Sequence, residues 1–198
     1  MHVTPKSLSS WFNILRENPD MLPRFGECFW ESQLVSKERI VDYVFPEESS
    51  SVVYIFGGWY GILAQLIDDN HMTQKIYTID IDSHCEEILT KYCPVNNIVP
   101  VTADMAEFKY VHHPDVVINT STEHVDQETY DKWWKNIPQD TFYILQGNNL
   151  TIPEHIRTAT DINHFMEINH CKKPSVKEVI ECPGPNGTFE RYMIAGYK

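Results

Sequence analysis

Apolar residues in the first 46 positions recur at helical spacing, as between Leu8 and Leu15, which predicts helices. We expect the first helix to begin at Thr4-Pro5, where proline suits the first turn, and to break at Asn18-Pro19. A second helix is expected to run from Ser32 or Ser36 to Val44. The polar residues 47–51 then serve as a connector to a region with a different pattern.

From residue 52 onward, short apolar runs alternate with helical stretches, which predicts strands covered on both faces by helices. The expected strands are 52–56, 76–79, 98–101, 115–118, 141–145, 176–181 and 189–197. The expected helices follow Gly61, cover 83–92 and 126–134, and lie within 153–169. Ser83 and Glu86 fit a capping box at the start of the 83–92 helix. The turn sequence 183–187 makes the last two strands an antiparallel hairpin.

Strand–helix alternation predicts an α/β fold with a parallel sheet and right-handed crossovers. Ligands bind such sheets beyond the carboxyl ends of the strands, where the strand order reverses. Candidate functional residues are therefore those that directly follow each strand. We divide the chain into a helical cover, residues 1–50, and a core, residues 51–198, of one domain.

The first three strand ends suit a ligand that contains adenosine. The turn from Gly57 through Gly58 and Trp59 to Gly61 leads into a helix, and glycine permits a tight turn and a close ligand approach. Asp80, at the end of the second strand with Ile81 after it, is placed to accept hydrogen bonds from ribose hydroxyls. Asp82 is the competing acid.

The third strand ends at Asp104, followed by Met105. The carboxylate can accept a hydrogen bond from the exocyclic amine of adenine, and the methionine can pack on the ring. Asp104 can equally cap the helical turn that begins at Ala106. Both interpretations stay open from the sequence.

The fourth and fifth strand ends carry polar residues that suit the binding of a polar substrate beside the reactive end of the ligand. Asn119 offers an amide, and Glu123 or His124 can act as a general base. The residues expected to contact the substrate are Ser36, Lys37, Ser121, Gln146, Asn148 and Asn149. An ordinary polar loop that caps the next helix is the alternative for the fourth strand end, and an ordinary amide-rich loop is the alternative for the fifth.

Charge and composition restrict the partners. Sixteen Lys and Arg against 28 Asp and Glu give a net charge of −12, so duplex nucleic acid is not expected to bind. Five cysteines without a CxxC pair indicate reduced thiols. The nine histidines match no standard zinc spacing, and we expect no metal. Without a membrane-length apolar run or a secretion signal, we expect a cytoplasmic protein, in the host cytoplasm if viral.

The glycine turn, Asp80 and Asp104 follow one another along the chain as they do in class I S-adenosylmethionine-dependent methyltransferases. The chain resembles this superfamily from about Val52 to its end. Within that superfamily the chain is similar to uncharacterised phage-type methyltransferases. The stretches that carry the narrower likeness are Ser32-Gln33 with Ser36-Lys37, Gly57–Gly61, Asn119–His124, Gln146–Asn149 and Arg191–Ile194.

The resemblance implies a Rossmann-like three-layer sandwich around a seven-stranded, mostly parallel sheet with an antiparallel C-terminal hairpin strand. It implies S-adenosyl-L-methionine as cofactor, with the three glycines around its methionine part, Asp80 on the ribose and Asp104 at the adenine. It implies methyl transfer to an acceptor that the sequence leaves open, a small molecule or a protein before duplex DNA.

Two positions depart from the superfamily pattern. Ile55 stands where an acid is usual, so the methionine ammonium needs another acceptor, such as Asn119 or a backbone carbonyl. Trp59 stands where glycine is frequent. Two other functions remain open: an oxidoreductase that binds NAD(P), although Phe56 occupies the place of its first glycine, and a binding protein without catalysis.

Overall fold

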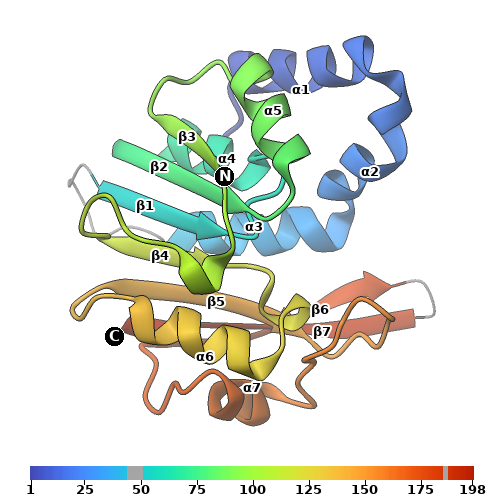
Figure 1. The fold of residues 1–198 in the computed structure, drawn as a ribbon. Coiled ribbons are helices and arrows are strands. Elements are labelled where there is room, and N and C mark those ends of the chain that lie inside the picture. Colours follow the sequence, from blue (N-terminus) through green and yellow to red (C-terminus); the bar gives the residue numbers. More distant parts are fainter. Residues whose placement is uncertain (44–50, 185–186) are drawn as a thin grey trace.

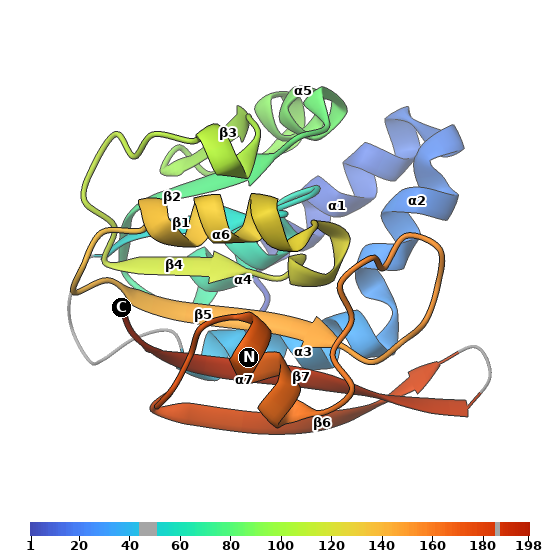
Figure 2. The ribbon, with the colours of Figure 1, turned by 60° about the horizontal axis from the view of Figure 1, so that its bottom comes forward.

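The computed structural model of the chain describes residues 1–43, 51–184 and 187–198. Its strands form one sheet with helices on both faces (Figures 1 and 2). The strands are β1 (Ser51–Phe56), β2 (Thr73–Asp80), β3 (Ile98–Thr102), β4 (Val116–Asn119), β5 (Phe142–Asn148), β6 (Val176–Gly184) and β7 (Gly187–Tyr197). The helices are α1 (Pro5–Glu17), α2 (Leu22–Gly26), α3 (Glu31–Tyr43), α4 (Ile62–Asn70), α5 (Ser83–Tyr92), α6 (Gln127–Asn136) and α7 (Ile162–Ile168).

The sheet has seven strands in the order β3-β2-β1-β4-β5-β7-β6. Strands β1 to β5 run parallel, whereas β7 is antiparallel to both β5 and β6. The predicted fold class is therefore confirmed. The order reverses between β1 and β4, so the loops that follow these two strands lie next to each other.

Alternating side chains of each central strand enter two separate cores. In β1, Val53 and Ile55 face the cluster that α1, α3, α4 and α5 cover. Val52, Tyr54 and Phe56 face the cluster on the side of α6 and α7. Burial on both faces explains why the first strand is apolar without interruption.

The second core is rich in aromatic side chains. Tyr130 and Trp133 of α6 are 0% and 1% exposed and pack on the sheet. The Tyr54 and Tyr77 rings stack with centroids 4.5 Å apart. The aromatic side chains of Tyr130 and Trp133 thus belong to the core.

Several predicted boundaries need correction. The capping box was wrong, because Asp82 caps α5 by accepting from the backbone N–H of His84, 3.0 Å away. Glu86 instead accepts from the backbone N–H of Thr102. Strand β2 begins three residues earlier than the apolar run indicated, at Thr73, and β5 continues to Asn148.

The N-terminal region contains more helix than predicted, because α2 and short 3-10 turns lie between α1 and α3. The predicted helix end at Val44 and residues 47–50 of the connector lie outside the described residues. The two glycines of the predicted hairpin turn belong to β6 and β7, and residues 185–186 between them also lie outside the described residues. No helix among the described residues is long and apolar enough to cross a membrane.

Candidate functional site

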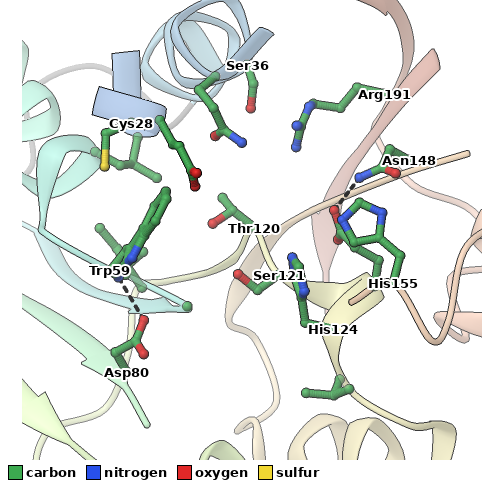
Figure 3. Close-up of a pocket in the computed structure, with 18 of the residues that line it drawn as sticks. Cys28, Ser36, Trp59, Asp80, Thr120, Ser121, His124, Asn148, His155 and Arg191 are labelled. Carbon is green, nitrogen blue, oxygen red and sulfur yellow. Dashed lines mark hydrogen bonds between the residues drawn. The ribbon is translucent and has the colours of Figure 1, made fainter. Parts of the chain in front are cut away.

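A cavity of about 920 Å³ opens at the carboxyl ends of the strands (Figure 3). Its walls come from the loops after β1, β2, β3 and β4, the end of β5 with the segment after it, the β6–β7 hairpin and the N-terminal helices. The volume lies in the upper part of the range for small-molecule pockets. Figure 3 shows Trp59 and Asp80 on one side of the cavity and Asn148, His155 and Arg191 on the other.

The glycine turn owes its residues to close packing. Gly57 and Gly61 have φ angles of +66° and +67°, which favour glycine. A Cβ on Gly57 would lie 2.1 Å from Ser121 Oγ, and one on Gly58 would lie 1.9 Å from Thr78 Oγ1. The glycines therefore bring β1 close to the loops after β4 and to β2, while the backbone of the turn lines the cavity.

Trp59 departs most from an ordinary turn. It has a φ of +48°, which is uncommon for a bulky residue. Its ring stacks on Tyr60 with centroids 5.6 Å apart, and its side chain lines the cavity. The indole thus occupies space that glycine would leave open.

Asp80 fixes this turn to the end of β2. Its Oδ2 accepts from the Trp59 backbone N–H at 2.9 Å, and its Oδ1 accepts from the Asp82 backbone N–H at 3.1 Å. Asp82 is engaged differently, because Arg24 of α2 binds its carboxylate and this contact lowers the pKa of Asp82. Each oxygen of Asp80 still has a lone pair for a ligand.

Asp104, at the end of the third strand, both caps the following turn and lies at the cavity. Asp104 Oδ1 accepts from the Ala106 backbone N–H at 2.9 Å and so caps its own turn. Asp104 and Met105 also line the cavity, as does the exposed Ile81. One carboxylate oxygen of Asp104 therefore serves the fold, and the other remains for a ligand.

Asn119 is fully buried, and its amide serves the fold. Its Oδ1 accepts from the Ser121 backbone N–H at 2.9 Å, and its amide nitrogen contacts Met105 sulfur at 3.8 Å. Ser121 itself lines the cavity and is shown at its centre in Figure 3. The structure places Asn119 beside the cavity wall rather than on it.

Glu123 brings a carboxylate to the opposite wall. Its side chain is 3% exposed, and its Oε1 accepts a hydrogen bond from the side-chain amide of Asn148 on β5. Its Oε2 has no hydrogen-bond partner among the described residues. A buried carboxylate oxygen without a donor is costly, so this atom is the natural contact for a ligand.

His124 and His155 lie beside Glu123, with ring centroids 4.8 Å apart. His124 Nδ1 lies 3.2 Å from the Glu154 carbonyl, and His155 Nδ1 lies 2.8 Å from the Leu150 carbonyl. Both histidines line the cavity. The sequence analysis did not select His155, because it lies outside any strand end.

Arg157 holds this wall together from behind. Its guanidinium donates to the Thr122 carbonyl at 2.8 Å and to Gln127 Oε1 at 2.8 Å. It also donates to the Ile168 carbonyl and to Asn169 Oδ1, and it lies 3.9 Å from the Tyr130 ring centroid. Burial lowers the pKa of Arg157. The side chain joins the loop after β4 to the segment after β5.

Ser36 and Gln146 attach the N-terminal cover to the sheet. Ser36 Oγ donates to Gln146 Oε1, and the Gln146 amide donates to the Ser36 carbonyl at 3.1 Å. Gln146 is fully buried, so it connects β5 to α3 rather than lining the cavity. Asn149, also predicted to bind substrate, accepts from the Glu190 backbone N–H at 2.9 Å.

Two cations reach the cavity from opposite elements. Lys37 of α3 donates to Gln33 Oε1 at 3.0 Å, and burial lowers its pKa to about 8. Arg191 of β7 is 5% exposed, and within the described part of the chain its Nε has no hydrogen-bond partner. Burial also raises the pKa of the nearby Cys28 thiol to about 12, so this thiol stays protonated at neutral pH.

The structure adds cavity residues that the sequence analysis did not select as site residues: Arg24, Glu27, Trp30, His155, Phe189 and Arg191. One signal for Arg191 was present in the sequence. It shares the inward face of the last strand with Phe189 and Met193, and a charged residue at such a position is unusual unless it is functional. The residues of the N-terminal cover carried no comparable signal.

No family model and no curated protein matches the chain. Solved structures with the same fold include the N-methyltransferase NodS from Bradyrhizobium japonicum WM9 in complex with S-adenosyl-L-homocysteine. It has a TM-score of 0.64 and 10% identity, and the match covers 98% of this chain and 99% of that one. The YcgJ protein from Bacillus subtilis has a TM-score of 0.65 and 10% identity, over 83% of this chain and 98% of that one.

A further match is magnesium protoporphyrin IX methyltransferase from Synechocystis PCC 6803 with bound SAM. Its TM-score is 0.60 and its identity 12%, over 83% of this chain and 80% of that one. At these identities the comparison shows the fold. The chain therefore has the Rossmann-like fold of these methyltransferases, and its chemistry has to be argued from its own cavity.

Proposed function

We propose that the protein is an S-adenosyl-L-methionine-dependent methyltransferase that acts on a small molecule. One observation supports this most: a single cavity joins the glycine turn, Asp80 and Asp104 to a second wall of polar side chains around Glu123. The first group suits an adenosyl ligand, and the second suits the group that receives the methyl. Structural neighbours named as SAM-bound or S-adenosylhomocysteine-bound methyltransferases support the same cofactor.

The residues of the donor side fit this cofactor. Asp80 keeps a free lone pair on each carboxylate oxygen, which two ribose hydroxyls can share. Asp104 and Met105 provide an acceptor and an apolar surface for adenine. Ile81, which lines the cavity next to Asp80, extends the apolar surface.

The methionine ammonium needs an acceptor other than residue 55. Asn119 is fully buried and does not line the cavity, so it does not meet this need. Glu27 lines the cavity from the N-terminal cover. We therefore assign the ammonium to Glu27 in this proposal.

When bound, the cofactor supplies an electrophilic methyl group on a sulfonium that leaves as a neutral thioether with the electron pair of the broken bond. The protein aligns the acceptor with that methyl and removes the proton of the acceptor. Glu123 Oε2 or a ring nitrogen of His124 can take this proton. Alignment in an enclosed site can supply about 7–11 kcal/mol of the barrier reduction in favourable cases.

The acceptor side favours a small molecule with an anionic group. Arg191 and Lys37 both line the cavity, and the guanidinium offers a paired set of donors to a carboxylate or phosphate. Trp30 and Ile156, each about 60% exposed, add apolar surface to the cavity lining. Ser36, Ser121 and Asn148 complete the polar contacts.

An oxidoreductase that binds NAD(P) is not favoured, because the neighbouring structures named above are methyltransferases or share their fold. The narrower likeness to phage-type enzymes rests on the sequence stretches alone and stays a prediction. The absence of duplex nucleic acid and membrane partners, the cytoplasmic location and the domain limits at residues 50 and 51 also stay predictions.

Calorimetry with S-adenosylhomocysteine tests the donor assignment. Asp80→Ala removes the ribose acceptor, and we expect the affinity to fall at least about tenfold, as for the loss of one charged hydrogen bond. Asp82→Ala is the matched control, because this carboxylate binds Arg24 at the same edge. Equal affinities of the two variants would contradict the ribose assignment, and no binding by the wild-type protein would contradict the proposed function.

A further inference from the structure

Three metal-binding side chains meet on the acceptor side of the cavity. One carboxylate oxygen of Glu123 and one ring nitrogen each of His124 and His155 lie within 4.8 Å of one another. Ligand atoms around a tetrahedral zinc ion lie about 3.3 Å apart, from bond lengths of about 2.0–2.2 Å. His124 is exposed, so its side chain has room to rotate toward the other two ligands and close this difference.

Backbone contacts fix the tautomer of both imidazoles. A carbonyl oxygen only accepts hydrogen bonds, so Nδ1 of His124 must donate to Glu154, and Nδ1 of His155 must donate to Leu150. In the neutral ring the lone pair then lies on Nε2 of each histidine. An imidazole held at one nitrogen by a carbonyl and free at the other is the usual arrangement of a metal ligand.

Glu123 supplies an independent observation. The residue is only 3% exposed, yet no donor among the described residues reaches Oε2. Asn148 already satisfies Oε1 and orients the group. One carboxylate oxygen of Glu123 and one ring nitrogen of each histidine thus lie in one small region, and a cation bound there would satisfy the Glu123 oxygen that lacks a donor.

The supporting contacts make this region rigid. The Glu123 carbonyl accepts from the backbone N–H groups of Ile156 and Arg157, at 2.9 and 3.1 Å. These bonds join the turn that carries Glu123 and His124 to the segment that carries His155. Arg157 strengthens the same junction through Thr122.

We infer that Glu123, His124 and His155 form a binding site for a divalent transition-metal ion, with zinc as the reference ion. Two imidazoles and one carboxylate suit zinc, iron and manganese, whereas magnesium and calcium prefer oxygen ligands. Three protein ligands leave a coordination position toward the cavity. This revises the sequence prediction that no metal binds.

The role of such an ion rests on the proposed function and narrows its acceptor. The open position would take an oxygen of the acceptor and increase the acidity of a hydroxyl there. With the ion bound, Glu123 and His124 would serve as ligands instead of as the base, and the hydroxyl proton would pass to solvent water. Arg191 lies on β7 directly opposite Asn148 and provides charge for an anionic group on the same molecule. The acceptor class is then a compound with a hydroxyl near a carboxylate or phosphate.

Zinc and cobalt binding test the site without any acceptor. Protein treated with EDTA and dialysed is titrated with Zn²⁺ by calorimetry and with Co²⁺ by visible absorption. We expect one equivalent to bind, and His124→Ala and His155→Ala to weaken Zn²⁺ at least about tenfold. The matched control is His113→Ala, because His113 is exposed and does not line the cavity.

His124 is exposed, so His124→Ala is expected to fold, and a thermal melt of each variant checks this. No Zn²⁺ binding by the wild-type protein, or equal affinity of His124→Ala and His113→Ala, overturns the site. S-adenosylhomocysteine binding is measured in EDTA on the same samples. If it fails while Zn²⁺ binds as expected, the metal site stands and the methyltransferase proposal fails.

Discussion

The two sides of the cavity are built in different ways. The donor side, made of the Gly57–Gly61 turn, Asp80 and Asp104, consists of residues at the ends of β1, β2 and β3 that hydrogen-bond to neighbouring backbone. The acceptor side joins the Thr122–His124 turn to β5 and to residues 150–157 through both side-chain and backbone contacts. Strand order brings the residues of the first side together, whereas the second side also depends on a segment that lies outside the strand ends.

This difference teaches where specificity resides in such a fold. The donor side can be nearly independent of the acceptor, since its geometry follows from the sheet. The acceptor side can change with a few side chains, since Arg157, Asn148 and Ser36 hold it in place. Replacing one of these side chains should therefore disturb the acceptor side and leave the donor side intact.

Arg157→Met should give the largest effect. It removes four hydrogen bonds of a buried cation and leaves the Thr122 carbonyl and Asn169 Oδ1 without donors. We expect the free energy of unfolding to fall by about 3 kcal/mol, measured by urea denaturation. Affinity for S-adenosylhomocysteine should be largely retained.

The control for this variant is Arg16→Met, because the Arg16 side chain is 72% exposed and its loss should leave stability nearly unchanged. A variant of Arg157 as stable as the control would show that the side chain does not support the acceptor side. Loss of both stability and cofactor affinity would show that the two sides are not separable.

Ser36→Ala should have an intermediate effect. It leaves Gln146 Oε1 buried without a donor, at a cost of about 1–2 kcal/mol in urea denaturation. The double variant Ser36→Ala with Gln146→Met removes both partners and should recover part of this loss. Ser9→Ala, at an exposed position of α1, is the control. Additive effects of the two substitutions would disprove coupling between α3 and β5.

Lys37→Met should change how the free energy of unfolding depends on pH. Because desolvation lowers the pKa of Lys37 from 10.5 to about 8, the unfolded chain binds more protons between these values. The contribution of Lys37 to stability should therefore rise with pH from about 8 to about 10.5, by at most about 1.4 kcal/mol per pH unit.

The measurement compares urea denaturation of wild-type and Lys37→Met protein at pH values below and above 8. The stabilising effect of the substitution should be largest below pH 8 and should decrease above it. Titration of Cys28 has the opposite sign, and Lys37 lowers the pKa of this thiol. Both proteins therefore carry Cys28→Ala, so that only Lys37 differs between them. A difference that does not vary with pH would show that Lys37 is well solvated.

The sequence predicted the fold, and it predicted that the glycine turn, Asp80 and Asp104 would meet at one edge of the sheet, because both follow from local patterns. Apolar runs fixed the strands, and the residues after them had to meet at one edge of the sheet. The acceptor side was less predictable, since no local pattern shows that His155 lies beside Glu123 or that Arg157 reaches Thr122. Asn119 and Gln146 were selected for their polarity, although the structure buries both in contacts of the fold.

The packing of Gly57 against Ser121 has an evolutionary consequence. A Cβ at position 57 would lie 2.1 Å from Ser121 Oγ, and the φ of +66° already favours glycine there. Residue 57 can therefore gain a side chain only if β1 and the loop after β4 move apart. Among diverging relatives, position 57 is expected to remain glycine wherever position 121 carries a side chain in this place.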